Sequence, residues 1–262
     1  ILSRYQNRRL TEFYDFQGWK QLIGYDYSDL FLFVLLILAI VPCYYNEQKY
    51  KMSEIILASK GQKKAYTYLK HGAVYLWIIC IVFAAASVNF LIFKVLYGLD
   101  GGWTCLYALS DYQYTPLNLS LFCFFLFINI MKCLSLIVFA RIGIWISGKV
   151  KNIYMIYLIL LAGTAVCLYC SGFVCSSSPV KQYLTLLNPL SGFQICELEK
   201  GCYGMNVFGH YVPWLAAYLC VQTGILLLSY IIPLFCSGLR KPGYRKLKGW
   251  FKRRRTDGSD GM

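Results

Sequence analysis

Five long runs of apolar, almost uncharged residues are the feature that most constrains the fold of this chain. They cover residues 30–45, 73–96, 119–146, 153–174 and 213–236. A soluble domain of 262 residues could bury a full core, but it would not repeat runs near the length that crosses a bilayer as a helix. Because backbone polar groups in lipid must be satisfied internally, the runs are expected to be helices rather than strands. The predicted fold class is therefore all-α, a polytopic bundle of about five transmembrane helices.

The first run, 30–45, is the shortest of the five. Its sixteen residues would rise only about 24 Å as a helix, less than a typical hydrocarbon core of about 30 Å. Tyrosines flank it at both ends, and such rings favour the headgroup level of a membrane. A short span is the favoured interpretation, and a re-entrant segment is the alternative.

The distribution of basic residues predicts which connections face the cytoplasm. The chain has 26 Lys plus Arg against 12 Asp plus Glu. The basic residues gather in the loop 46–71, in the short connection 147–152 and in the tail 237–262, whereas the connection 97–118 has none. By the positive-inside rule, the three basic segments are cytoplasmic, and the segments 1–29 and 175–212 lie outside. These features predict a multi-pass protein of the cell membrane with a cytoplasmic C-terminus.

The basic tail indicates contact with lipid. So short a strip of Lys and Arg beside the last span is expected to hold anionic headgroups of the inner leaflet. Membrane lipids are therefore expected partners, and nucleic acid is not.

The loop 46–71 contains a second pattern, a short amphipathic helix. One narrow face is formed at i, i+3, i+4 and i+7 by Met52, Ile55, Ile56 and Ser59. Gly61 is expected to end this helix, because glycine readily takes the left-handed conformation of a C-terminal cap. Lys63 and Lys64 then begin the stretch that leads into the second span. On this pattern alone, a basic inside loop with an interfacial helix is the simpler interpretation.

Together with the run before it, this loop resembles the type-2 ATP-binding-cassette (ABC) permeases, the membrane subunits of bacterial ABC exporters. The family pattern has a glutamate, an Ile- or Leu-rich pair, a Ser or Thr, a basic-Gly-basic turn and a lysine before the next helix. "YDYSDL" at 25–30 is also similar to the family. The resemblance covers residues 25–72 by motif and most of the chain by the order of spans. The matching positions are Glu47, Met52, Ile56, Leu57, Ser59, Lys60, Gly61, Lys63, Lys64 and Lys70.

The resemblance implies that this helix is a coupling helix, docked in a groove of a separate ATPase subunit. It also implies a second permease protomer, identical or different, and a sixth span before the outer segment that this chain lacks. Met52, Ile55 and Ile56 would be the apolar anchors of the contact. The residues expected at the ATPase interface are Glu47, Met52, Ile55, Ile56, Leu57, Ser59, Gly61, Lys63 and Lys64.

Lys132 lies near the middle of the run 119–146, where a charge is costly. Such residues usually face a bundle interior, a cavity or a partner charge. With Asn129, which could hydrogen-bond to another helix, Lys132 is a candidate for the translocation path. Pairing within the bundle or with the other protomer is the alternative.

The outer loop 175–212 contains "LTLLNPLSGF", a leucine-rich stretch broken by Pro189. The family resemblance implies a short hairpin of helices that dips toward the membrane and closes the path. An ordinary folded loop would have the same sequence features.

Enzymatic chemistry has no visible constellation in this sequence. There are two histidines and no HExxH, GxSxG or paired span carboxylates, and the GxxxxGK[ST] nucleotide loop is absent. No cofactor or metal is expected; among twelve cysteines, only Cys196 and Cys202 suggest an outer pair. The prediction is a permease subunit, an exporter by resemblance, with ATP hydrolysis on a partner. The alternative is a non-transporting membrane scaffold or sensor.

Overall fold

A computed structural model describes residues 15–25, 27–50, 63–113, 115, 117–150, 152–171, 179–200, 204–207 and 210–239 of the chain. The basic tail from residue 240 onward therefore lies outside the described residues. The chain separates into two units, residues 1–222 and 223–262. All of the packing described below belongs to the first unit.

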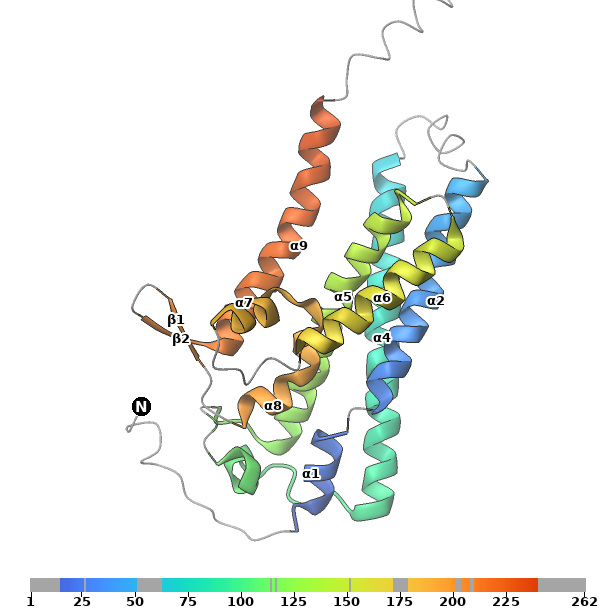
Figure 1. Ribbon diagram of the computed structural model, residues 1–262. Helices are drawn as coiled ribbons and strands as arrows, with labels where there is room; N and C mark the ends of the chain where they lie inside the picture. Colours follow the sequence, from blue (N-terminus) through green and yellow to red (C-terminus); the bar gives the residue numbers. More distant parts are fainter. Residues whose placement is uncertain are drawn as a thin grey trace, which may run out of the picture. The chain divides into compact units, whose positions relative to one another are not determined.

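The described residues contain five helical stretches that are long and apolar enough to cross a membrane. This finding confirms the predicted polytopic helical protein. Four of these helices are α4, α5, α6 and α9, and the fifth stretch, Gln17–Glu47, combines the short helix α1 with α2. The bounds are α1 Gln17–Ile23, α2 Tyr27–Lys49, α4 Lys63–Tyr97, α5 Leu121–Ser147, α6 Ile153–Ser171 and α9 Trp214–Leu239 (Figure 1).

Helix α2 is longer than the apolar run that predicted it. It has 23 residues, which rise about 34 Å and can cross a hydrocarbon core. The last turn of the helix, past the apolar run, contains Glu47, whose carboxylate has an ion-pair partner on α4, described below. Helix α4 likewise begins at Lys63, ten residues before its apolar run.

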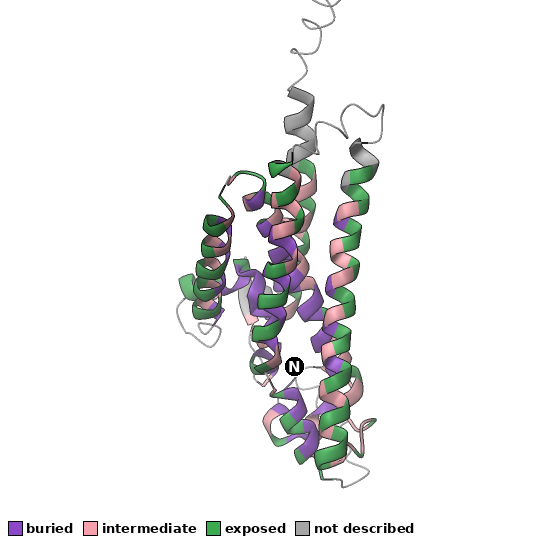
Figure 2. Ribbon diagram, turned by 90° about the vertical axis from the view of Figure 1, so that its right-hand side faces the viewer, coloured by how far each residue is buried: buried purple, intermediate pink, exposed green. Residues whose placement is uncertain are grey.

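Helix α5 is the central helix of the first unit. In its apolar window 61 % of the residues are buried, against 17 % for the windows of α4 and α6. Helices α2, α4 and α6 all pack against it. Figure 2 shows buried residues where the helices meet and exposed residues along their outer sides. Those exposed residues include many large apolar side chains on α4 and α6, which fit a hydrocarbon surrounding better than water.

The connection between α6 and α9 folds back into this bundle. It contains α7 (Pro179–Leu187), the 3-10 helix η4 (Pro189–Gln194) and α8 (Ile195–Glu199). Leu190 and Phe193 of η4 are buried in the same core cluster as residues of α2, α4, α5 and α6. The sequence left open whether this region is helical or an ordinary loop; the structure has buried helical pieces.

The depth of η4 follows from its contacts with α5. A Cβ added to Gly192 would meet Ser135 and Met131, and Ser135 lies about 21 Å along a helix of about 40 Å. The segment therefore reaches the middle of a membrane-length helix. Beyond α8, the strands β1 (Gly204–Val207) and β2 (His210–Pro213) form an antiparallel hairpin, which the sequence analysis did not predict.

Helix α1 packs as part of a cap at the opposite end of the unit from the last turn of α2 and the first turn of α4 (Figure 1). Trp19 is 1 % exposed, and its Nε1 donates a hydrogen bond to the carbonyl of Asp100 at 2.9 Å. The short 3-10 helices η2 (Leu106–Ala108) and η3 (Ser110–Tyr112) lie in the same connection as Asp100. Helix α8 also contacts α1, because Cys196 Sγ donates a hydrogen bond to the carbonyl of Ile23. The structure thus brings together three segments that the sequence places on one side of the membrane.

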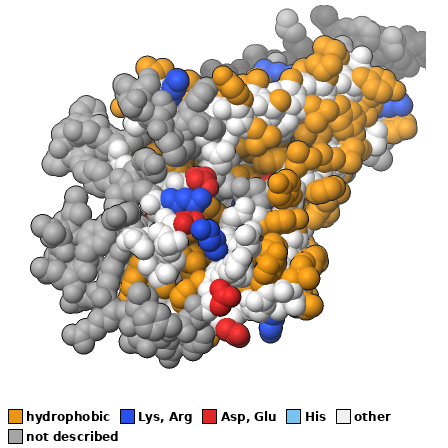
Figure 3. Space-filling view, turned by 60° about the horizontal axis from the view of Figure 1, so that its bottom comes forward, with side chains coloured by type: hydrophobic (Ala, Val, Ile, Leu, Met, Phe, Trp, Pro, Cys, Tyr) orange, Lys and Arg blue, Asp and Glu red, His pale blue; other side chains and the backbone are white. Residues whose placement is uncertain are grey.

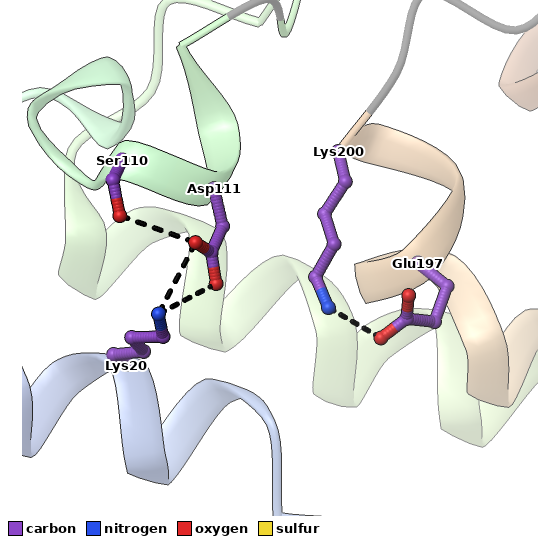
Figure 4. A network of polar contacts seen from close by, with 5 residues as sticks. All are labelled: Lys20, Ser110, Asp111, Glu197 and Lys200. Atoms are coloured by element: carbon purple, nitrogen blue, oxygen red, sulfur yellow. Dashed lines mark hydrogen bonds and ion pairs between the residues drawn. The ribbon is translucent and has the colours of Figure 1, made fainter.

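Charged side chains tie the cap together at its surface. Lys20 of α1 pairs with Asp111 of η3 at 3.0 Å, and Ser110 donates a hydrogen bond to the same carboxylate (Figure 4). The hydrogen bond from Lys20 holds the pKa of Asp111 below its usual range. Beside them, Lys200 pairs with Glu197 at 2.5 Å. In Figure 3, with this end turned forward, acidic and basic side chains gather in a small area beside a hydrophobic flank.

Glu199 gives the cap an expected pH dependence. Its side chain is buried, and Thr115 Oγ1 donates to Oε2 at 3.2 Å. Burial raises the pKa of Glu199, so the native state holds a proton that the unfolded state releases. The free energy of unfolding should therefore fall as the pH rises above the ordinary glutamate value of 4.5. Glu199→Gln should raise the thermal midpoint at pH 7.5 and flatten its decline between pH 5 and pH 7.5.

The matched control is Glu197→Gln, because the side chain of Glu197 is 57 % exposed. Thermal unfolding in detergent, measured across that pH range, compares the three proteins. Equal pH slopes for the wild type and Glu199→Gln would show that the buried carboxyl does not titrate with folding.

Candidate functional site

A buried ion pair joins the first span to the third. Lys132 Nζ lies 2.8 Å from Asp29 Oδ1, and each side chain is 10 % exposed. Asp29 is in the first turn of α2, where the positive end of the helix dipole also favours a carboxylate. The charge of Lys132 is therefore met within the bundle, which was one of the alternatives that the sequence left open. Its role in a translocation path stays a prediction.

The ion pair lies beside a break in the backbone. Helix α1 ends at Ile23 and α2 begins at Tyr27, so the N-terminus of α2 opens toward α4 and α5. There Asn89 Nδ2 donates to Ser28 Oγ at 3.1 Å. Phe193 of η4 covers the same place, with its ring centre 5.7 Å from Lys132 Nζ. The break between α1 and α2, the ion pair and η4 form one site.

A small cavity lies within this site. Its volume is about 20 Å³, and its polar lining comes from Ser28, Asp29, Asn89, Asn129 and Lys132. Among the described residues, Asn129 has no hydrogen-bond partner on another helix, although the sequence analysis suggested that it could have one. Its Nδ2 instead donates to the carbonyl of Phe125 in α5 at 2.8 Å, one turn earlier. Lys132 and Asn129 are thus neighbours on one buried face.

Tyr218 of α9 fastens η4 to α5, and the sequence analysis did not find it. Its hydroxyl donates to the carbonyl of Pro189 at 2.8 Å and accepts from the backbone N–H of Gly192 at 3.1 Å. The hydroxyl of Ser135 lies 3.0 Å from it. A tyrosine near the start of an apolar span gives no signal for such a role, because rings at span ends are common.

A second cluster of polar side chains, called the clasp below, joins the last turn of α2 to the first turns of α4. Its members are Glu47, Tyr66 and Lys70. Glu47 Oε2 lies 2.6 Å from Lys70 Nζ, and Tyr66 donates a hydrogen bond to the same carboxylate at 2.5 Å. Lys70 also donates to the carbonyl of Cys43 at 2.9 Å, and its ammonium lies over the ring of Tyr44. Two positions that matched the family pattern, Glu47 and Lys70, are therefore direct partners.

His71 extends the clasp to α5. Its Nε2 lies 3.0 Å from Arg141 Nη1, and its Nδ1 lies 2.8 Å from the hydroxyl of Tyr44. A guanidinium can only donate, so Nε2 must accept and the ring hydrogen is assigned to Nδ1. His71 is neutral in this arrangement. From its place on α4 it contacts Tyr44 of α2 and Arg141 of α5, and so links the three helices.

The remaining predicted coupling residues are not placed by the structure. Lys63 and Lys64 begin α4, but their side chains are outside the described set. Cys202, the proposed partner of Cys196, is also outside the described residues. The other coupling residues outside the described range are Met52, Ile55, Ile56, Leu57, Ser59 and Gly61.

Comparison with known proteins returns no family model, no curated protein and no solved structure that matches this chain. Among the residues with described positions, no group of three or more His, Cys, Asp or Glu could hold a metal ion. Functional inference therefore rests on the geometry of the ion-pair site and the clasp.

Proposed function

We propose that the chain is the membrane-spanning permease subunit of an ATP-driven ABC transporter, working as an exporter. It would move substrate by alternating access, with ATP hydrolysis on a separate ATPase subunit and with a second permease protomer completing the path. The family resemblance of residues 25–72 suggests this assignment, and the structure adds a physical reason for it.

The observation that carries the proposal is the buried position of η4 among membrane-length helices. Backbone outside regular spans is tolerated at membrane depth only where it is enclosed by protein or lines a cavity. Here the segment is enclosed by α5, α6 and the start of α9, next to a charged cavity. A scaffold needs no such segment, whereas a transporter needs an element that closes one side of its path.

The clasp supports the coupling part of the proposal. A short helix between α2 and α4 can transmit a movement only if its two ends are held firmly. The Glu47–Lys70 ion pair holds them to each other, and the contacts of His71 pass the connection on to α5. Movement of the loop would therefore reach the central helix of the bundle.

The proposal is tested at the loop. Met52→Asp combined with Ile56→Asp should abolish co-purification of the proposed ATPase subunit, because unpaired charge in an apolar contact costs several kcal/mol. The double variant should still insert and fold, because the loop lies outside the hydrocarbon. ATP hydrolysis by the assembled complex should fall with the loss of contact.

The control is Lys63→Ala combined with Lys64→Ala, which should weaken the complex far less if these lysines meet lipid. Full retention of the ATPase by the double Asp variant would show that 46–71 is only a basic inside loop. Absence of any ATPase from wild-type preparations would favour a scaffold or sensor.

A further inference from the structure

The cavity beside Lys132 contains hydrogen-bonding groups that the protein itself does not satisfy. An ammonium has three donors, and the described residues offer Lys132 one acceptor, Asp29 Oδ1. Asn129 is 6 % exposed and uses only its Nδ2, toward Phe125. Within the described part of the chain, no donor reaches its Oδ1. Among the described residues, two donors of Lys132 and the acceptor of Asn129 therefore lack partners, and both residues line one small cavity.

Size and charge restrict what could satisfy both groups. A volume of about 20 Å³ exceeds the roughly 10–15 Å³ that a water molecule requires, so the cavity has room for water. An anion is disfavoured because Asp29 already neutralises Lys132, and a cation is disfavoured by the ammonium. The occupant must also accept from a lysine and donate to an amide oxygen. Water does both.

We propose that one water molecule occupies this cavity, accepts a hydrogen bond from Lys132 Nζ and donates one to Asn129 Oδ1. The water makes Asn129 a third member of the ion-pair site, although the described contacts include no direct bond between Asn129 and Lys132. The ammonium keeps its charge in the bundle because its donors are then better satisfied. This inference is independent of the proposed transport function.

A double-mutant cycle on the full chain in detergent tests the bridge. Asn129→Leu removes the acceptor and fills the space, and it is compared in the wild type and in an Asp29→Asn, Lys132→Met background. Asn129→Leu also removes the hydrogen bond to the carbonyl of Phe125, but it does so in both backgrounds, so this contribution cancels in the cycle. The fall in thermal midpoint should be larger in the wild type by at least about 2 °C, the shift expected from one hydrogen bond.

Thr164→Val is the matched control, because the one described hydrogen bond of its hydroxyl goes to the carbonyl of Leu161 in its own helix. It should shift the midpoint equally in both backgrounds. Equal shifts for Asn129→Leu as well would overturn the bridge.

A high-resolution map of the wild type in nanodiscs provides the second test. A solvent peak about 3 Å from both Lys132 Nζ and Asn129 Oδ1 is expected. An empty site, or an Asn129 oxygen turned directly onto Lys132, would overturn the proposal even if the cycle shows coupling.

Discussion

Lys132→Met is expected to lower the free energy of unfolding by about 3–5 kcal/mol, because it leaves the Asp29 carboxylate buried without its ammonium. The two groups are 2.8 Å apart, and each side chain is 10 % exposed, so solvent can replace little of the lost interaction. For a chain of this length the loss corresponds to a fall of roughly 10 °C in thermal midpoint. Thermal unfolding in detergent micelles measures it.

The Asp29→Asn, Lys132→Met double variant separates the ion pair from other effects. Replacing a buried pair by neutral groups of similar size is often close to neutral, so the double variant should recover most of the stability lost by either single change. Lys149→Met is the control, because Lys149 is exposed and its ammonium lies over the ring of Trp145. A double variant whose loss equals the sum of the single losses would show that the pair is not coupled.

The sequence reveals one half of this ion pair and hides the other. Lys132 is evident because a lysine within a long apolar run is rare and needs a reason. Asp29 stands at the start of an apolar run, where an acidic residue is explained well enough as part of a helix N-terminus. The partners are 103 residues apart, and only the packing of α2 against α5 brings them together.

The number of spans was predictable, whereas the depth of η4 was not. The thickness of the bilayer sets the length of each uncharged apolar run, and that length can be read directly from the local sequence. The stretch around Pro189 has the same pattern on a surface loop and in a buried segment. Tertiary contacts decide how deeply η4 is buried. Gly192 allows close approach to α5, and Tyr218 supplies the hydrogen bonds that the irregular backbone needs.

The clasp shows the same limit. Glu47 and Lys70 were both recognised as matching positions in the loop pattern, but nothing in the pattern pairs them. Their ion pair arises because the last turn of α2 and the first turns of α4 lie side by side.

Gly192→Ala should displace η4 from α5 and destabilise the bundle by about 3 kcal/mol or more. The added methyl group would lie against Ser135 Oγ, far inside van der Waals contact, and 2.8 Å from the Tyr218 hydroxyl. Both neighbours are fully buried on long helices, so neither can yield without disturbing the core. The displacement would also break the hydrogen bonds of Tyr218 to Pro189 and Gly192. Thermal unfolding measures the loss, and faster thiol labelling of Cys133, kept as the sole cysteine, reports the opened core.

Two further variants make this result specific. Gly163→Ala in α6 meets nothing within 4 Å, so it should be neutral or slightly stabilising, as expected for alanine in a helix. Ser135→Ala removes the nearest atom in the way of the new methyl group, so combining it with Gly192→Ala should restore part of the stability. Rescue should stay incomplete, because Tyr218 and the carbonyl of Met131 at 3.3 Å still crowd the site. If Gly192→Ala unfolds and labels like the wild type, then η4 does not press against α5, and the proposed permease function loses the observation that carries it.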